Sequence, residues 1–248
     1  MEKTISIFAI LLFSLSFTMQ AQESIKIGSQ TWMKKNLDTD RFANGEVIPE
    51  AKTDEEWDAA GNNQEPAWCY YDNDPANGAK YGRLNNWFAV ADPRGLCPAG
   101  WHVPSDEEWT KLEDYLGGRN VAGNKLKSIQ FWEKVDEECQ NCKSWTEEYR
   151  RKVACHQCKD SRKSGRKVSL GTNSSGFSAL PGGGRLSDGT FSNFGDGGLW
   201  WSSKEYSSAD AWNRYPDAWN RYLSYSVAGS DRGYDTKTNG FSVRCLRD

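Results

Sequence analysis

Hydrophobic and polar residues alternate near both ends of the chain. Residues 25–27 and 31–33 show this period of two on either side of a glycine-containing turn at 28–30, which predicts a β-hairpin. Residues 240–247 alternate in the same way and predict a half-buried terminal strand. Because both ends are strand-like, we expect them to pair within one domain.

Two related segments indicate helix starts. Thr53 and Ser105 are each followed by Asp-Glu-Glu-Trp, a capping box that also places acidic side chains at the positive end of a helix. After Ser105, apolar residues recur at helical spacing until the glycines at 117–118, which predicts a helix of about 11 residues whose apolar face lies in the core. Another helix is predicted over residues 84–90.

The last third of the chain has short β-type runs separated by glycines, at 176–180, 181–185 and 197–203. It also contains a tandem duplication, in which DAWNRYP at 210–216 is followed at once by DAWNRYL at 217–223. An odd-numbered insertion within a strand would move every later side chain to the other face. We therefore expect the extra copy to form a loop at the end of a hairpin.

The most apolar stretch lies at the N-terminus. Lys3, the apolar run at 5–17 and the polar residues at 18–21 have the pattern of a secretory signal peptide covering residues 1–21. The apolar run is too short for a membrane-spanning helix, which needs roughly 20 residues, and no later stretch is as apolar. We expect cleavage and export, with residues 22–248 forming a single domain without a transmembrane segment, secreted or associated with the cell surface.

Composition limits the choice of partner. The chain has 12 Trp, 10 Tyr and 10 Phe together with 23 Gly, so large flat side chains pack between many tight turns. The net charge of -3 gives no indication of a nucleic-acid partner. Residues 150–167 nevertheless hold eight Lys and Arg against a single Asp. Such a segment is either a solvated surface or a site for an acidic polysaccharide.

Four of the seven cysteines follow the spacing C-x2-C-x12-C-x2-C. They are Cys139, Cys142, Cys155 and Cys158. Two such pairs can present four sulfurs to one tetrahedral zinc ion, which predicts a structural zinc site in a cysteine-rich basic insertion at about 133–168. Because thiols outside the cytoplasm are readily oxidised, two disulfides are the main alternative, and a redox-active pair is another.

The remaining cysteines, Cys69, Cys97 and Cys245, allow one disulfide and one free thiol. Cys97 precedes the helix that follows Ser105, and Cys245 lies on the closing strand. A bridge between them would close a loop of about 150 residues and restrict the unfolded chain strongly. We predict this disulfide and expect Cys69 to be free and buried.

Six stretches, in order along the chain, resemble the Fibrobacter succinogenes major paralogous domain, a family of exported bacterial proteins. The stretches are IGSQTWMKKNL at 27–37, YGRLNNW at 81–87, CPAGWHVP at 97–104, GFSALPGG at 176–183, WWSS at 200–203 and GFSVRC at 240–245. More remotely, residues 103–109 and 240–244 are similar to formylglycine-generating, sulfatase-modifying proteins. That similarity implies an α+β, C-type lectin-like fold with two to three helices beside a small twisted antiparallel sheet, long loops and the four-cysteine insertion.

Catalytic motifs are missing from the sequence. It contains no nucleophile elbow, zinc-protease motif, P-loop or dinucleotide-binding glycine pattern. His102 is expected to be packed and hydrogen-bonded rather than catalytic. The sulfatase-modifying proteins need a cysteine pair before the closing strand, whereas residues 171–244 contain no Cys. The resemblance therefore implies a shared fold without the activity, and we expect no enzyme.

One loop has residues that could alternatively form a calcium site. Asp72, Asp74 and Asn77, followed by Gly78, resemble a set of oxygen ligands. Their spacing is one residue off the EF-hand pattern, which also requires a later Glu. Turn formation by Asp, Asn, Pro and Gly explains the same residues.

The sequence favours an exported, non-catalytic binding or surface-interaction module with a glycan as its partner. Aromatic rings stack on sugars through an apolar face and bond them through a polar edge. The candidate ligand-binding residues are Trp200, Trp201, Trp212, Trp219 and Tyr222. For Trp200 and Trp201, burial in the core is the alternative. The competing functions are a structural envelope protein, an exported thiol oxidoreductase and a sulfatase-modifying-type enzyme.

Metal analysis of the exported protein tests the zinc prediction. We expect a single zinc ion per chain, and we expect the four clustered thiols to become reactive only after a chelator removes it. Two disulfides would give the opposite result, because the thiols would then appear only after reduction and no zinc would be found.

Overall fold

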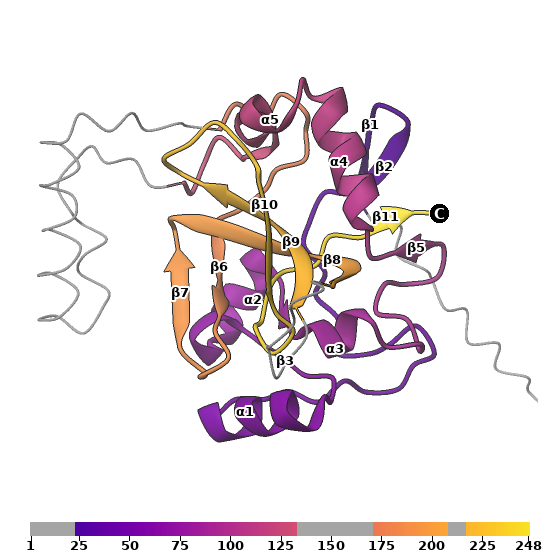
Figure 1. The fold of residues 1–248 in the computed structure, drawn as a ribbon, viewed down its shortest axis with the longest axis vertical. Coiled ribbons are helices and arrows are strands. Elements are labelled where there is room, and N and C mark those ends of the chain that lie inside the picture. The colour runs from indigo at the N-terminus through magenta and orange to yellow at the C-terminus, as the bar shows by residue number, and fades with distance from the viewer. Residues whose placement is uncertain (1–22, 133–170, 208–216) are drawn as a thin grey trace, which may run out of the picture.

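The computed structural model in Figure 1 describes residues 23–132, 171–207 and 217–248. The predictions that fall outside the described residues concern the signal peptide at 1–21, the insertion at about 133–168 with its cysteines Cys139, Cys142, Cys155 and Cys158, and Trp212.

Helices and strands combine in an α+β fold, as predicted. The prediction of two to three helices beside one small antiparallel sheet was wrong, because the described residues contain five α-helices and two larger sheets, one of which includes a parallel pair. The helices are α1 (Asp54–Asn63), α2 (Pro75–Tyr81), α3 (Trp87–Val90), α4 (Asp106–Tyr115), α5 (Arg119–Leu126) and the short 3-10 helix η1 (Tyr71–Asn73). The strands are β1 (Ser24–Ile27), β2 (Gln30–Met33), β3 (Trp68–Cys69), β4 (Leu84–Asn85), β5 (Trp101–His102), β6 (Gly182–Arg185), β7 (Phe191–Phe194), β8 (Gly197–Tyr206), β9 (Asp217–Ser224), β10 (Asp231–Thr236) and β11 (Leu246–Arg247). Within the described ranges, no helix is long and apolar enough to cross a membrane.

Two larger sheets organise the fold (Figure 1). A four-stranded sheet has the order β1-β2-β11-β5, and a five-stranded sheet has the order β10-β9-β8-β6-β7. The predicted N-terminal hairpin is β1 with β2, and β11 pairs with β2 at Leu246 and Trp32. The two ends of the chain therefore meet in one sheet, as predicted. In Figure 1, α4 and α5 lie at one end of the molecule and α1 at the other.

The terminal segment differs from its prediction. Only Leu246–Arg247 pairs regularly as β11, while residues 240–245 form isolated bridges with β4, β6 and β8. Side chains on both faces of this segment are buried, Phe241 on one face and Ser242 and Arg244 on the other. The prediction of a half-buried strand was therefore wrong. The segment contacts elements on both sides, so it has no solvent face.

Both predicted capping boxes are present. At the start of α4, the Ser105 hydroxyl accepts from Glu108 N at 3.2 Å, and the Glu108 carboxylate accepts from Ser105 N at 2.8 Å. Thr53 and Glu56 make the same pair of bonds at the start of α1. Reciprocal bonds satisfy amides that a helix end would otherwise leave unpaired, which explains why the sequence located both starts correctly.

The helix predicted over residues 84–90 begins later than expected. Leu84–Asn85 is the short strand β4, and α3 starts at Trp87. The Asn86 side chain accepts from Ala89 N at 3.1 Å and so caps the helix. Asn86 has an extended backbone, so the helix cannot include it, and its side chain caps the helix that begins at the next residue.

One buried amide, that of Asn36, joins four distant segments of the chain. Its Nδ2 donates to Tyr81 O at 2.8 Å and to Ser242 Oγ at 3.2 Å. Its Oδ1 accepts from Trp200 Nε1 at 2.9 Å and from two nitrogens of Arg244, at 3.0 and 2.7 Å. All of these hydrogen bonds are shielded from water. If the amide were removed, no water could replace the hydrogen bond that each partner makes with it.

Arg244 is a buried cation held mainly by carbonyl oxygens. Its Nη1 donates to the carbonyls of Met33, Lys34 and Phe177 at 3.2, 2.9 and 2.6 Å, and its guanidinium lies 4.4 Å from the Phe177 ring centre. No carboxylate of the described chain forms an ion pair with it. Burial lowers the pKa of Arg244. The planar, five-donor guanidinium can satisfy this many acceptors at once, which an ammonium cannot.

The predicted disulfide between Cys97 and Cys245 is present, and it joins residues 148 positions apart. Cys69 is free and buried, as expected, and burial raises the pKa of its thiol to about 12. A thiol in this state is unreactive. The disulfide fastens the closing segment next to Arg244, so a covalent bond and a polar network hold the same part of the chain.

The second copy of the duplicated segment forms β9, which begins at Asp217. β8 ends at Tyr206 and pairs antiparallel with β9, so the first copy at 210–216 belongs to the connection of this hairpin. Its conformation lies outside the described residues. The prediction that the extra copy is looped out therefore stays a prediction.

Replacing Arg244 by lysine tests the role of its guanidinium. The Arg244→Lys variant keeps the charge but leaves several buried oxygens unpaired, so we expect the free energy of unfolding to fall by about 3 kcal/mol or more. Denaturant unfolding of the exported protein measures this. Arg247→Lys, at an exposed position three residues further on, is the matched control and should change stability by less than about 0.5 kcal/mol. Equal effects of the two variants would contradict the assignment.

Candidate functional site

Trp200 and Trp201 are core residues, which corrects their prediction as ligand contacts. Both indoles are fully buried, and they belong to different hydrophobic clusters. Trp201 Nε1 donates to Asn85 O at 2.8 Å, and its ring lies 4.4 Å from that of Phe241. Their strand, β8, has neighbours on both edges, and residues next to each other on a strand point to opposite faces. Both faces are covered here, so neither ring is available to a sugar.

The other two described candidates lie on opposite faces of β9. Tyr222 is half-buried and packs against the core, and burial raises the pKa of its hydroxyl. Trp219 is also half-buried, but it contacts aromatic side chains of the neighbouring strands instead of the core. Trp219 is therefore the predicted candidate that leads to a surface.

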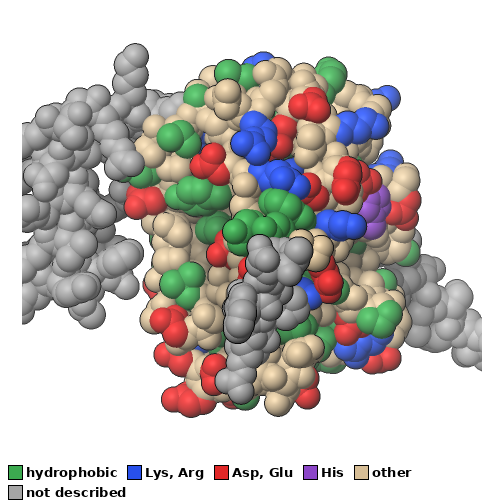
Figure 2. All heavy atoms as spheres, in the orientation of Figure 1, with side chains coloured by type: hydrophobic (Ala, Val, Ile, Leu, Met, Phe, Trp, Pro, Cys, Tyr) green, Lys and Arg blue, Asp and Glu red, His purple; other side chains and the backbone are tan. Residues whose placement is uncertain are grey.

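Three rings from adjacent strands form what we call the aromatic patch, defined by Tyr206, Trp219 and Tyr234. The register pairs Tyr234 with Trp219 and Tyr206 with Asp217, which puts all three rings on one face. The two tyrosine rings stack in parallel with their centres 3.8 Å apart, and the indole is perpendicular to both. Tyr234 is 50% exposed. In Figure 2, hydrophobic side chains gather near the centre of this face beside Lys and Arg side chains.

Arg232 covers the indole of the aromatic patch. Its guanidinium carbon lies 3.4 Å from the Trp219 ring centre. The same guanidinium donates to both oxygens of Asp106 at 2.7 to 3.0 Å. A guanidinium that is fixed by a carboxylate stacks well on an aromatic face. The ring left open to solvent is therefore that of Tyr234.

An ion network, formed by the buried Asp106, Glu113 and Arg221 and the partly exposed Arg232, anchors the patch to α4. Arg221 donates to Asp106 at 2.7 Å and to Glu113 at 2.9 Å, and the Ser230 hydroxyl also donates to Glu113 at 2.7 Å. Although burial alone would raise the pKa of Asp106, its bonds to the two arginines outweigh burial and lower it. For Glu113, burial dominates and raises the pKa. The network fixes β9 and β10 against the helix.

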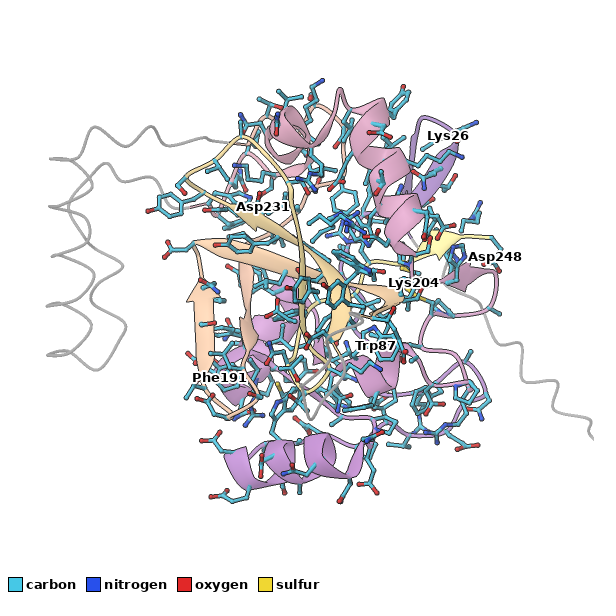
Figure 3. The ribbon with its side chains drawn as sticks, viewed as in Figure 1. Lys26, Trp87, Phe191, Lys204, Asp231 and Asp248 are labelled. Carbon is cyan, nitrogen blue, oxygen red and sulfur yellow. A yellow bond between two sulfur atoms is a disulfide. The ribbon has the colours of Figure 1, made fainter. Side chains whose placement is uncertain are left out.

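A separate hollow of about 610 Å³ lies beside the disulfide. Its wall includes Leu96, Cys97, Trp101, His102, Glu108 and Ser203. His102 is half-buried, and its ring nitrogens form hydrogen bonds with Asp248 Oδ1 at 2.7 Å and with Glu108 Oε1 at 3.0 Å. Burial lowers the pKa of His102, but the bonds with these two carboxylates outweigh burial and raise it. Figure 3 labels Asp248 beyond the end of β11.

The loop with candidate calcium ligands uses its side chains within the turn. Asp74 Oδ1 accepts from Ala76 N at 2.9 Å and so caps α2, while Asn77 Nδ2 donates to Tyr71 O at 3.0 Å. Among the described residues, no group of three or more His, Cys, Asp and Glu side chains is arranged to hold a metal ion. The four clustered cysteines lie outside the described residues, so they are not among these side chains.

A sequence model of the Fibrobacter succinogenes major domain matches residues 25–247. The chain belongs to this family. The searches of curated proteins and of solved structures gave no match. Five of the six stretches that carry the resemblance to the Fibrobacter succinogenes major domain meet at Asn36 and Arg244, through Tyr81, Phe177 and Trp200. The family pattern is thus largely a core pattern.

Sequence reasoning missed Tyr206, Arg232 and Tyr234. Arg232 and Tyr234 are two residues apart on β10 and therefore share a face, which is a signal that the segment DRGYDT already carries. Tyr206 had no such signal, because its ring reaches Tyr234 only through strand pairing across β9. Contacts between strands depend on register, which the sequence did not reveal.

Titration of His102 tests its two carboxylate contacts. Because the folded-state pKa is raised above 6.5, the contribution of His102 to stability is complete below pH 6.5 and is lost as the pH rises through the folded-state pKa. We expect its ring NMR signals to titrate above pH 6.5, and at lower pH in Asp248→Asn. The Asp231→Asn variant, at an exposed position distant in sequence, should leave the midpoint unchanged. The same midpoint in both variants would contradict the contact with Asp248.

Proposed function

We propose that the mature protein is an exported, non-catalytic binding module that recognises a glycan through the aromatic patch. The observation that carries this proposal is the half-exposed ring of Tyr234, held in place by a parallel stack on Tyr206. A ring that is already ordered loses little conformational entropy when a ligand stacks on it. Sugar rings present C–H groups that fit an aromatic face.

Polar groups border the patch and suit sugar hydroxyls. Arg232 uses Nε and Nη2 for Asp106 and keeps part of its side chain in solvent. Donors and acceptors around an apolar face are the combination that orients a carbohydrate. The local charge is mixed, which favours hydroxyl recognition over attraction of one charge sign.

Two features support binding without chemistry. Both ring nitrogens of His102 are occupied by carboxylates, so neither is available to take a proton from a substrate. The free thiol of Cys69 is buried and its pKa is raised. An exported thiol oxidoreductase would have to use the four clustered cysteines, for which we propose a structural zinc ion instead.

We also propose that the fold is of the C-type lectin-like type and that the protein acts outside the cytoplasm. The pairing of β11 with β2, the two helices α4 and α5 packed together and the long irregular segments support that fold. The disulfide between Cys97 and Cys245 suits an oxidising compartment, as does the N-terminal signal-peptide pattern. The basic insertion would add a second, electrostatic contact at the cell surface.

Truncation of Tyr234 tests this function on a glycan array. The Tyr234→Ala variant should bind any glycan recognised by the native protein about two- to tenfold more weakly, because one stacked ring contributes roughly 0.5–1.5 kcal/mol. The matched control is Tyr115→Ala, which removes a tyrosine from α4 that is 66% exposed and should bind like the native protein. If the folded native protein binds no glycan, the structural envelope function replaces this proposal.

A further inference from the structure

The stretch at 97–104 is the part of the family pattern that the bonds of Asn36 and Arg244 do not include, and core packing explains it only in part, through the buried Cys97 and Val103. The large rings of the other stretches, such as Trp32, Trp87 and Phe177, are buried. Trp101 and His102 are only half-buried, and both line the hollow beside the disulfide, although part of the Trp101 ring also packs against the core. Side chains that a fold does not need for its core are available to a ligand.

The wall of the hollow combines the groups that hold a sugar. The aliphatic part of the wall comes from Val90, Leu96 and Val103, and Trp101 adds an indole. Hydroxyls come from Ser105 and Ser203, and a carboxylate comes from Glu108. An aromatic ring with nearby hydroxyl and carboxylate groups matches the alternating apolar and polar surfaces of a sugar ring. A volume of about 610 Å³ is within the range of small-ligand pockets.

The charges around the hollow disfavour an acidic ligand. Glu108 and Asp248 both contact His102, so two carboxylates face a single imidazole. Arg94, next to the wall residue Gly95, is already paired with Asp92 and Glu46. Arg247, whose guanidinium lies 5.0 Å from the Trp101 ring centre, adds one positive charge here, against the two carboxylates of Glu108 and Asp248. The carboxylate of a uronic acid would be repelled by Glu108 and Asp248. A sugar hydroxyl or amine could instead donate a hydrogen bond to these carboxylates.

The hollow and the aromatic patch lie on either side of the first turn of α4. Ser105 lines the hollow, and the next residue, Asp106, holds Arg232 against Trp219. Ser203 of the hollow and Tyr206 of the patch belong to the same strand, β8. One extended ligand that crosses this turn can therefore reach both surfaces.

We propose that the hollow is a second sugar subsite, which takes a neutral or amine-bearing unit of the same oligosaccharide that contacts the aromatic patch. This inference rests on the proposed function. It assigns the ligand to non-acidic oligosaccharides and gives Trp101, Ser203 and Glu108 contacting roles. The bond between His102 and Glu108 keeps the carboxylate oriented toward the hollow.

The test uses the exported full chain on an array of neutral, amine-bearing and uronic-acid-containing oligosaccharides. Ser203→Leu fills the hollow without changing Trp101 or His102, and Trp101→Leu removes the indole. Each should weaken binding at least tenfold. Ser29→Leu, at an exposed position in the β1–β2 turn, is the matched control. Thermal unfolding of each variant confirms that it is folded.

The outcomes separate the two proposals. Loss of binding in Tyr234→Ala but not in Ser203→Leu or Trp101→Leu rejects the hollow and leaves the proposed function standing. Loss only in the hollow variants rejects the patch, and with it both the proposed function and the shared ligand, and leaves the hollow as a sugar site by itself. No binding by the native protein rejects both, and binding limited to uronic acids overturns the charge assignment.

A direct measurement places the sugar. Addition of the best-binding array oligosaccharide should shift the ring signals of His102, one of only two histidines in the chain, and the indole N–H signal of Trp101. In Ser203→Leu these shifts should disappear. Binding without a shift of either signal would show that the sugar does not enter the hollow.

Discussion

The fold depends on the hydrogen bonds that Asn36 and Arg244 make with each other and with the segments around them. A buried guanidinium costs free energy unless its donors are satisfied, and here the acceptors come from the N-terminal hairpin, the segment around Phe177 and the Asn36 amide. Those acceptors reach Arg244 only when the segments are correctly placed. The network thus selects one arrangement of parts that are far apart in the chain.

The closing segment shows how covalent and polar constraints act together. Residues 240–245 lie between β4, β6 and β8 with no exposed face, and the disulfide from Cys245 to Cys97 ties the segment to the start of β5 and α4. A cross-link over so long a loop lowers the entropy of the unfolded chain. The same cross-link borders the hollow, so the element that stabilises the fold also shapes a candidate site.

A second buried network connects the core to the surface. Arg221 is buried between Asp106 and Glu113, and Asp106 also holds Arg232, which covers Trp219. Removal of Arg221 would leave the buried carboxylate of Glu113 without its ion-pair partner. The patch is therefore a rigid continuation of the α4 contact and not a mobile surface, which suits recognition by preformed rings.

The sequence by itself determined the local features, which are both capping boxes and the N-terminal hairpin, and two long-range features, which are the pairing of the chain ends and the disulfide between Cys97 and Cys245. These follow from bonds between near neighbours or from a small number of combinations. Only the tertiary structure decided that Trp200 and Trp201 are buried while Tyr234 is exposed, and that Ser242 and Arg244 lie inside. The physical reason is that exposure depends on which elements cover each strand face, and on the register that brings Tyr206 to Tyr234. Alternation along one strand does not contain that information.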